Sequence, residues 1–249
     1  MRTVWWWVAV AALWGCIACG TSGTGEEVVP FTLAIETDPV GRRFTTATGW
    51  EVELEEAHIA LGAVTLYSNA PPTASWMERL RGWFVPVAHA HAGFDEYEGG
   101  TVRGELLEPV VLDLLGEGRP FEAALEGIAG PVRSVSLELR TVAAAPLSGA
   151  HARVRGTASR DGEVIRFEGG LALPADAKSR RVTGIPAELT LADGAEVRLV
   201  VHPQRWFADA DFSSLPEAGE GGVRPIPTDS QVHAAWYLGA RGWGAFTVH

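Results

Sequence analysis

Residues 89–100 hold the densest group of potential metal ligands in the chain. They include two histidines, three carboxylates and a tyrosine, namely His89, His91, Asp95, Glu96, Tyr97 and Glu98. Side chains two positions apart on a strand share a face, so an extended backbone would present His89 and His91 together. Neutral imidazole binds copper, zinc or nickel, and a carboxylate from Asp95 or Glu98 would complete a ligand set typical of a transition metal. The stretch therefore predicts a metal site, and the alternative is a solvated surface loop.

The residues before this stretch favour an extended backbone. Val85 precedes Pro86, and a residue before proline is disfavoured in the helical conformation. His202, expected at the end of a strand beside Trp206, is the candidate for a third ligand. We interpret the remaining histidines as surface or packed residues, because a histidine on its own is more often either of these than a metal ligand. They are His58, which we keep as a reserve ligand, and His151, His233 and His249.

Composition and motifs exclude several classes of function. The chain of 249 residues carries a formal charge of -11, and we find no basic patch of the kind that binds nucleic acid. Its only lysine is Lys178, which leaves little scope for Schiff-base or phosphate-loop chemistry. There is no nucleophile elbow, zinc-type cysteine pair or His-Glu-x-x-His helix. We therefore expect a protein that is not an enzyme.

The N-terminus is typical of an exported lipoprotein. A short basic start and an apolar run predict a signal peptide over residues 1–18. Cys16 and Cys19 each end a segment that resembles the lipobox of bacterial lipoproteins, and we prefer Cys19 as the lipidated residue while Cys16 stays open. Residues 19–27 are flexible enough to be the tether to a folded domain. The alternative is ordinary signal cleavage beside incidental cysteines.

The expected location is the bacterial cell envelope, with the membrane reached through the lipid. Gly20 follows the preferred cysteine, and by resemblance to known sorting rules the lack of an acidic residue there favours the outer over the inner membrane. No cysteine follows Cys19, so the mature domain would hold no disulfide.

Alternation of apolar and polar residues predicts strands along most of residues 28–249, which we take as one domain. Phe31, Leu33 and Ile35 alternate with polar or small residues in one strand, and the run over residues 133–140 is the clearest example. Asp161-Gly162 and Asp193-Gly194 are hairpin dipeptides that favour antiparallel pairing. The predicted fold is all-β, an antiparallel β-sandwich or jelly roll with one or two short helices.

Some stretches need a more specific interpretation. The apolar phase changes after Leu54, which predicts a β-bulge near Glu55, because burying Glu56 and His58 without partners would be costly. A short helix is predicted over residues 75–81 and a helical turn over 203–212. Residues 215–229 are expected to be a mobile loop. Two closing strands are predicted, over residues 234–239 and 244–248.

Two of the predicted strands suggest a family. The run Phe44-Thr45-Thr46-Ala47-Thr48-Gly49-Trp50-Glu51-Val52-Glu53-Leu54 and the run Ala60-Leu61-Gly62-Ala63-Val64-Thr65-Leu66-Tyr67-Ser68 resemble the opening of the MbnP-like family. These are periplasmic copper-binding proteins associated with methanobactin systems. The resemblance implies copper as the metal, and it assigns no ligand residue in this chain.

Two functional hypotheses follow. The first is a metal-binding envelope protein that holds copper through His89 and His91, with His202, Asp95 or Glu98 completing the site. The second is a non-catalytic adhesion or assembly lipoprotein whose tryptophan- and glycine-rich loops contact another protein or a glycan. The second hypothesis predicts an exposed apolar surface and no converging ligands.

Overall fold

The computed structural model describes residues 26–71, 100–116, 120–218 and 221–249. In this part of the chain thirteen strands form a single mixed sheet. The strands are β1 (Val28–Thr37), β2 (Arg43–Thr45), β3 (Glu51–Tyr67), β4 (Val102–Leu106), β5 (Val110–Asp113), β6 (Phe121–Ile128), β7 (Gly130–Leu139), β8 (Ala152–Arg160), β9 (Glu163–Leu171), β10 (Arg181–Leu191), β11 (Ala195–Val201), β12 (Val223–Pro225) and β13 (Phe246–Val248). The helices are α3 (Ala177–Arg180) and α4 (Gln231–Arg241), with 3-10 turns η1 (Pro39–Arg42), η2 (Pro203–Phe207), η3 (Phe212–Ser214) and η4 (Trp243–Ala245).

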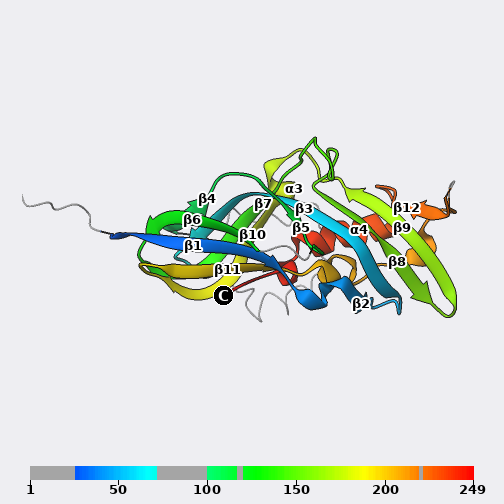
Figure 1. Cartoon of the computed structure of the whole chain (residues 1–249), viewed down its shortest axis with the longest axis horizontal. Helices are drawn as coiled ribbons and strands as arrows, with labels where there is room; N and C mark the ends of the chain where they lie inside the picture. Colours follow the sequence, from blue (N-terminus) through cyan, green and yellow to red (C-terminus); the bar gives the residue numbers. More distant parts are fainter. Residues whose placement is uncertain (1–25, 72–99, 117–119, 219–220) are drawn as a thin grey trace, which may run out of the picture.

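The long strand β3 runs through the middle of the molecule (Figure 1) and connects its two ends. One edge of β3 pairs first with β8 and then with β7. The other edge pairs in turn with β2, β5 and β4. Because each half of β3 has different partners, the sheet divides around it into two packed regions.

The region around the second half of β3 is the sandwich. From β4 the sheet continues through β6, β1 and β11 to β13, and from β7 it continues to β10. These two leaves face each other, and their far strands, β10 and β13, come close again. The inward side chains of Leu33, Ile35, Leu137 and Leu199 are at most 1% exposed. This apolar interior is the core that alternation along the strands predicts.

The region around the first half of β3 is covered by helical turns. Trp50, just before β3, and Phe167 on β9 meet rings from η2 and η3, and η2 in turn meets Trp236 of α4. The ring centroids of Phe167 and Phe212 are 4.7 Å apart, and those of Phe207 and Trp236 are 5.2 Å apart. Burying aromatic rings of this size contributes a large part of the hydrophobic stabilisation.

The predicted all-β fold class with short helices is confirmed, and two strand pairs are parallel, β1 with β11 and β12 with β9. The predicted bulge is also confirmed. The register of β3 against β8 shifts between Leu54 and Glu56, which turns Ala57, Ile59 and Leu61 inward with no exposed surface. Asp161 and Gly162 form the turn between the antiparallel strands β8 and β9, as expected.

Two local predictions are wrong because distant contacts decide them. The chain turns at Asp193-Gly194, but the strands on either side do not pair, since β10 pairs with β7 and β11 with β1. Residues 234–239 are helical within α4 and not a closing strand. Val232, Trp236 and Ala240, each four residues apart, bury one face of that helix.

Other predictions have mixed outcomes. The stretch 215–229, expected to be a loop, contains β12, which pairs with β9. The helical turn near residue 203 is present as η2, and the closing strand near the C-terminus is β13. The helix predicted over 75–81 lies outside the described residues, as do the signal peptide and Cys19. None of the described helices has the length and hydropathy that crossing a bilayer requires.

Gly239→Ala should lower the free energy of unfolding by about 1–3 kcal/mol, because it overpacks the contact between α4 and η2. A methyl group at this position would lie 2.4 Å from the carbonyl oxygen of Arg205 and 2.6 Å from that of Trp206. In an uncrowded helix the same change stabilises by about 1 kcal/mol, so the sign of the effect tests the contact. Gly244→Ala is the matched control, since a methyl group there would meet no atom within 4 Å. Urea unfolding measures both, and equal stabilities would contradict this packing.

Candidate functional site

His202 lies where the strands β1 and β11 end side by side. Its Nδ1 is 2.9 Å from Oδ2 of Asp38, and its Nε2 is 2.9 Å from Oγ1 of Thr247. The parallel register places Thr37 beside Val201, so the next residue of each strand, Asp38 and His202, meet. The imidazole is partly buried, and it is held by partners from three separate parts of the chain.

The Asp38 carboxylate fixes the tautomer of this imidazole. Burial raises the pKa of Asp38, but hydrogen bonds from the Val40 N–H, His202 and Gln204 outweigh it and hold that pKa below its ordinary value. An ionised carboxylate only accepts hydrogen bonds, so Nδ1 of His202 carries the proton. In the neutral ring Nε2 is then the acceptor, here from the Thr247 hydroxyl. A carboxylate behind the ring and an unprotonated Nε2 in front is the arrangement that orients metal-binding histidines.

The ends of the segment that carries His89 and His91 are tied together by described residues. Ser68 N–H donates to the carbonyl of Thr101, and Thr101 N–H donates to the Ser68 hydroxyl, both at 3.0 Å. The Ser134 hydroxyl donates to the carbonyl of Asn69 at 2.7 Å, which places the departing chain over β7. These hydrogen bonds hold together the described residues on both sides of the segment, 68–71 and 100–101, which we call the neck.

A chain of contacts connects this neck to His202. Gly184 lies on β10 with a positive φ of 71°. A methyl group placed at Gly184 would lie 3.2 Å from Pro71 and 3.7 Å from the ring of Trp243, so this glycine is close to both residues. The indole N–H of Trp243 donates to the Thr183 carbonyl at 2.7 Å. Trp243 begins η4, and η4 ends at Ala245, whose carbonyl accepts from the backbone N–H of His202 at 2.9 Å. The first residue of η4 thus lies beside the part of β10 that Pro71 approaches, and its last residue bonds to the backbone of His202.

Most of the other predicted site residues lie in a part of the chain that the structure does not describe. His89, His91, Asp95 and Glu98 lie outside the described residues. His58 is described, and its Nδ1 is 4.0 Å from Oδ1 of Asp113. Within the described ranges no three histidine, cysteine, aspartate or glutamate side chains converge on a common point that would hold a metal ion.

Asp38 and Thr247 are the residues that sequence reasoning missed. Asp38 follows the strand predicted through Ile35, and Thr247 lies in the closing strand predicted over residues 244–248. Their approach to His202 depends on the parallel pairing of β1 with β11 and on the pairing of β13 with β11. No short-range pattern indicates either pairing.

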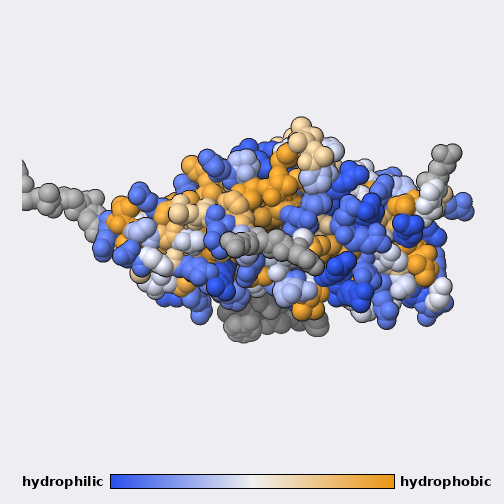
Figure 2. Space-filling view, viewed as in Figure 1, coloured by the Kyte–Doolittle hydropathy of each residue, from blue (hydrophilic) through white to orange (hydrophobic). Residues whose placement is uncertain are grey.

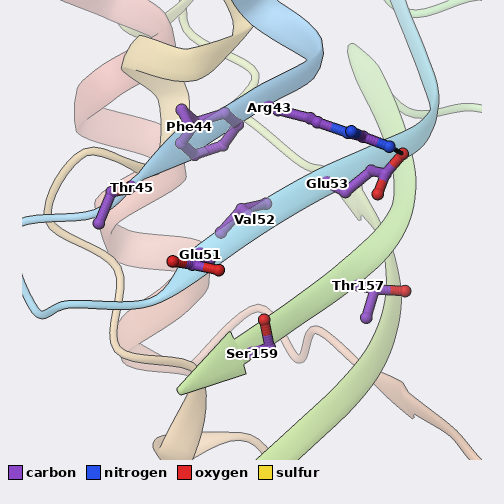
Figure 3. Close-up of a pocket in the computed structure, with 8 residues that line it drawn as sticks. All are labelled: Arg43, Phe44, Thr45, Glu51, Val52, Glu53, Thr157 and Ser159. Atoms are coloured by element: carbon purple, nitrogen blue, oxygen red, sulfur yellow. Dashed lines mark hydrogen bonds and ion pairs between the residues drawn. The ribbon is translucent and has the colours of Figure 1, made fainter. Parts of the chain in front are cut away.

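A shallow groove of about 460 Å³ lies elsewhere, at the edge formed by β2, β3 and β8 (Figure 3). Arg43 reaches to Glu53 with an ion pair of 2.7 Å, while Thr157 and Ser159 stand on the neighbouring strand. Phe44 adds an aromatic ring. The carboxylates of Glu51 and Glu53 also line the groove, so it offers charged, polar and aromatic contacts.

Two buried histidines flank the chain after β9. Nδ1 of His151 accepts from the N–H of Leu173 at 3.3 Å, and Nε2 of His233 accepts from the N–H of Ala172 at 3.5 Å. Burial lowers the pKa of both histidines, and Arg180 adds to the effect at His151. Both rings are therefore neutral hydrogen-bond acceptors, and together they hold the backbone of residues 172 and 173.

Neither a family model nor a curated protein matches this chain. A search of solved structures finds "MbnP from Methylosinus trichosporium", with a TM-score of 0.43 and 10% sequence identity, over 89% of this chain and 98% of that chain. This is a weak resemblance at the level of the fold, to a protein of the family that the two opening strands resemble. At this score and identity it assigns neither a function nor a site residue to this chain.

Acid should destabilise the protein through His151 and His233. Both have a folded-state pKa below the unfolded value of about 6.5, so their stabilisation is complete above pH 6.5 and is lost as the pH falls below it. Each contributes at most about 2 kcal/mol between pH 6.5 and 5.

Unfolding measured across this range should show a shallower dependence in the double variant His151→Gln plus His233→Gln, since glutamine accepts a hydrogen bond without titrating. His249→Gln is the control, because His249 is exposed. An unchanged pH dependence in the double variant would show that these histidines do not carry the effect.

Proposed function

We propose that this chain is a lipid-anchored protein of the bacterial cell envelope that binds a transition metal, copper, without catalysing a reaction. The ligands are His89 and His91, joined by His202 and by a carboxylate from Asp95 or Glu98. Cys19 carries the lipid. The observation that carries the proposal is the ring of His202, which Asp38 holds with Nε2 as a hydrogen-bond acceptor.

The chemistry of His202 supports this role. A metal ion at Nε2 has only to replace the hydroxyl of Thr247, because the proton of the ring is already on Nδ1. Asp38 would remain behind the ring and increase the basicity of the ligand. The imidazole would then bind as a neutral ligand, the form that copper requires.

The position of the neck supports the choice of partners. Eight residues lie between His91 and Gly100, and an extended chain of that length spans at most about 30 Å. The contacts from Pro71 through Gly184 and Trp243 bring the neck to the same η4 turn that binds the backbone of His202. The proposal requires that this length of chain bring His89 and His91 to His202.

A second candidate is the adhesion or assembly protein that contacts a protein or a glycan. The groove at β2, β3 and β8 favours it, because Phe44 beside an exposed ion pair and two hydroxyls suits a polar ligand with an apolar face. This candidate predicts that replacing His89 and His91 leaves partner binding unchanged.

Copper titration of the detergent-solubilised full chain tests the first candidate. We expect one copper ion per chain, bound at least 100-fold more weakly by the variant His89→Ala plus His91→Ala. His249→Ala controls for the loss of an exposed histidine. Equal affinity of the double variant and the parent chain would remove the proposal.

A second titration tests His202 through its partner. Asp38→Asn keeps the shape of the side chain but removes the charge behind the ring, and changes of this kind lower metal affinity by about 10–100-fold. Copper affinity of this variant, measured beside that of Asp193→Asn on an exposed turn, reports the effect. Unchanged affinity in Asp38→Asn would exclude His202 from the site.

A further inference from the structure

Among the described residues, β6 is bonded along one edge, and its other edge is open over most of its length. Its bonded edge pairs with β1 from Val28↔Ile128 to Ile35↔Phe121. On the other edge the described residues provide a single pair, Gly104↔Gly127 with β4. The neighbouring strand β5 pairs with β3 alone. An edge of this kind presents free N–H and C=O groups to a further strand.

Two glycines explain why β4 and β6 meet at one point. A methyl group at Gly127 would lie 2.4 Å from the carbonyl oxygen of Arg103, and one at Gly104 would lie 2.8 Å from the ring of Phe31. Only glycine permits such a close crossing. Past the crossing, Pro109 interrupts the chain between β4 and β5, and the described part of β6 has no partner on that side.

The core is incompletely covered along this edge. Phe121, Ala123 and Leu125 on β6 point inward but are only half-buried, although their partners on β1 are at most 3% exposed. Leu107 and Val111 on the β4–β5 side are 67% and 43% exposed. Figure 2 shows apolar surface gathered in the middle of this face, in the region where Figure 1 places β4 and β5.

The alternation of the backbone shows which residues face the open edge. Ala129 N–H donates to the carbonyl of Glu27 at 2.9 Å, at the continuation of the β1–β6 pairing. Successive residues of a strand direct their backbone groups to opposite sides, so the odd-numbered residues of β6 bond to β1. Glu122, Ala124 and Glu126 therefore present their N–H and C=O groups to the open edge.

The charge along this edge indicates the chemistry of the partner. Glu122 and Glu126 on β6 itself are exposed, and so are Glu105 on β4, which crosses β6, and Glu108 just after it. A second copy of β6 would bring Glu122 and Glu126 against like charges, which is unfavourable in a cross-strand pair. A basic strand would instead meet opposite charges.

We propose that β6 is a docking site for an extended peptide segment of a partner protein that alternates apolar and basic residues. The segment adds as a strand beside Glu122, Ala124 and Glu126, its apolar side chains cover Phe121, Ala123 and Leu125, and its basic side chains meet the carboxylates. This surface is separate from the proposed metal site, and its occupation does not require copper.

A peptide of about eight residues that alternates valine and arginine is the probe, and one that alternates valine and glutamate is its control. We expect the full chain in detergent to bind the first and not the second. Ala124→Pro removes an N–H on the open edge while leaving the bonds to β1, and should weaken binding at least tenfold. Ala124→Val should bind normally. Equal affinity in the proline variant would overturn the proposal.

The charges are tested in the same assay. Glu122→Gln plus Glu126→Gln should weaken binding several-fold and reduce its dependence on salt, whereas Glu188→Gln, an exposed change on β10, should have no effect. Loss of binding in Glu188→Gln equal to that in the double variant would mean general attraction to an acidic protein and would overturn the site.

Amide hydrogen exchange distinguishes a bound partner peptide from the other segments that could cover the open edge of β6. In the chain alone, the amides of Glu122, Ala124 and Glu126 should exchange quickly, and the peptide should protect them while Ala123 stays protected throughout. Protection of the three amides without peptide would assign the edge to the chain itself. Concentration-dependent protection without peptide would assign it to a second copy. Either result would overturn the proposal.

Discussion

The rest of the structure depends on the pairing of β3 along both of its edges. A shift of one residue would turn the whole buried face of this strand outward. The bulge between Leu54 and Glu56 keeps Leu54 and Ile59 on the same face although they are five positions apart, which in a regular strand would place them on opposite faces. It also leaves Glu56 in an exposed ion pair with Arg155, which avoids the cost of several kcal/mol for burying a lone carboxylate. The register set here positions β8, β7, β4 and β5.

Local patterns in the sequence predict the strands themselves but not their partners. Alternation locates β1 and β7, and the change of phase after Leu54 locates the bulge, because both follow from which face is buried. The Asp193-Gly194 turn is also local, but the strands beside it pair with β7 and β1 and not with each other, which the turn residues do not encode. The Trp236 helix was missed because two consecutive small residues precede an aromatic run, and only the spacing to Val232 and Ala240 distinguishes it from a strand.

The same limit applies to the candidate site. His202 was recognised as a candidate from its place at a strand end, but Asp38 lies far away in the sequence and approaches through a parallel pair that no turn motif encodes. The pairing has a chemical consequence. Parallel strands that end together bring the last side chains of both to one edge of the sheet. An imidazole and a carboxylate meet there, and the carboxylate decides which ring nitrogen remains able to bind a metal ion.

The excess of acidic residues in this chain has its clearest structural effect along β6. An open sheet edge next to half-buried apolar side chains favours self-association, and proteins commonly protect such edges with charge. Here Glu122 and Glu126 are exposed on the strand whose backbone is open, so two copies repel each other at the place where they would otherwise pair. The same carboxylates attract a basic strand. One arrangement of charge would therefore both oppose pairing between copies and favour the basic partner that we propose, at an edge where the described residues leave part of the core half-buried.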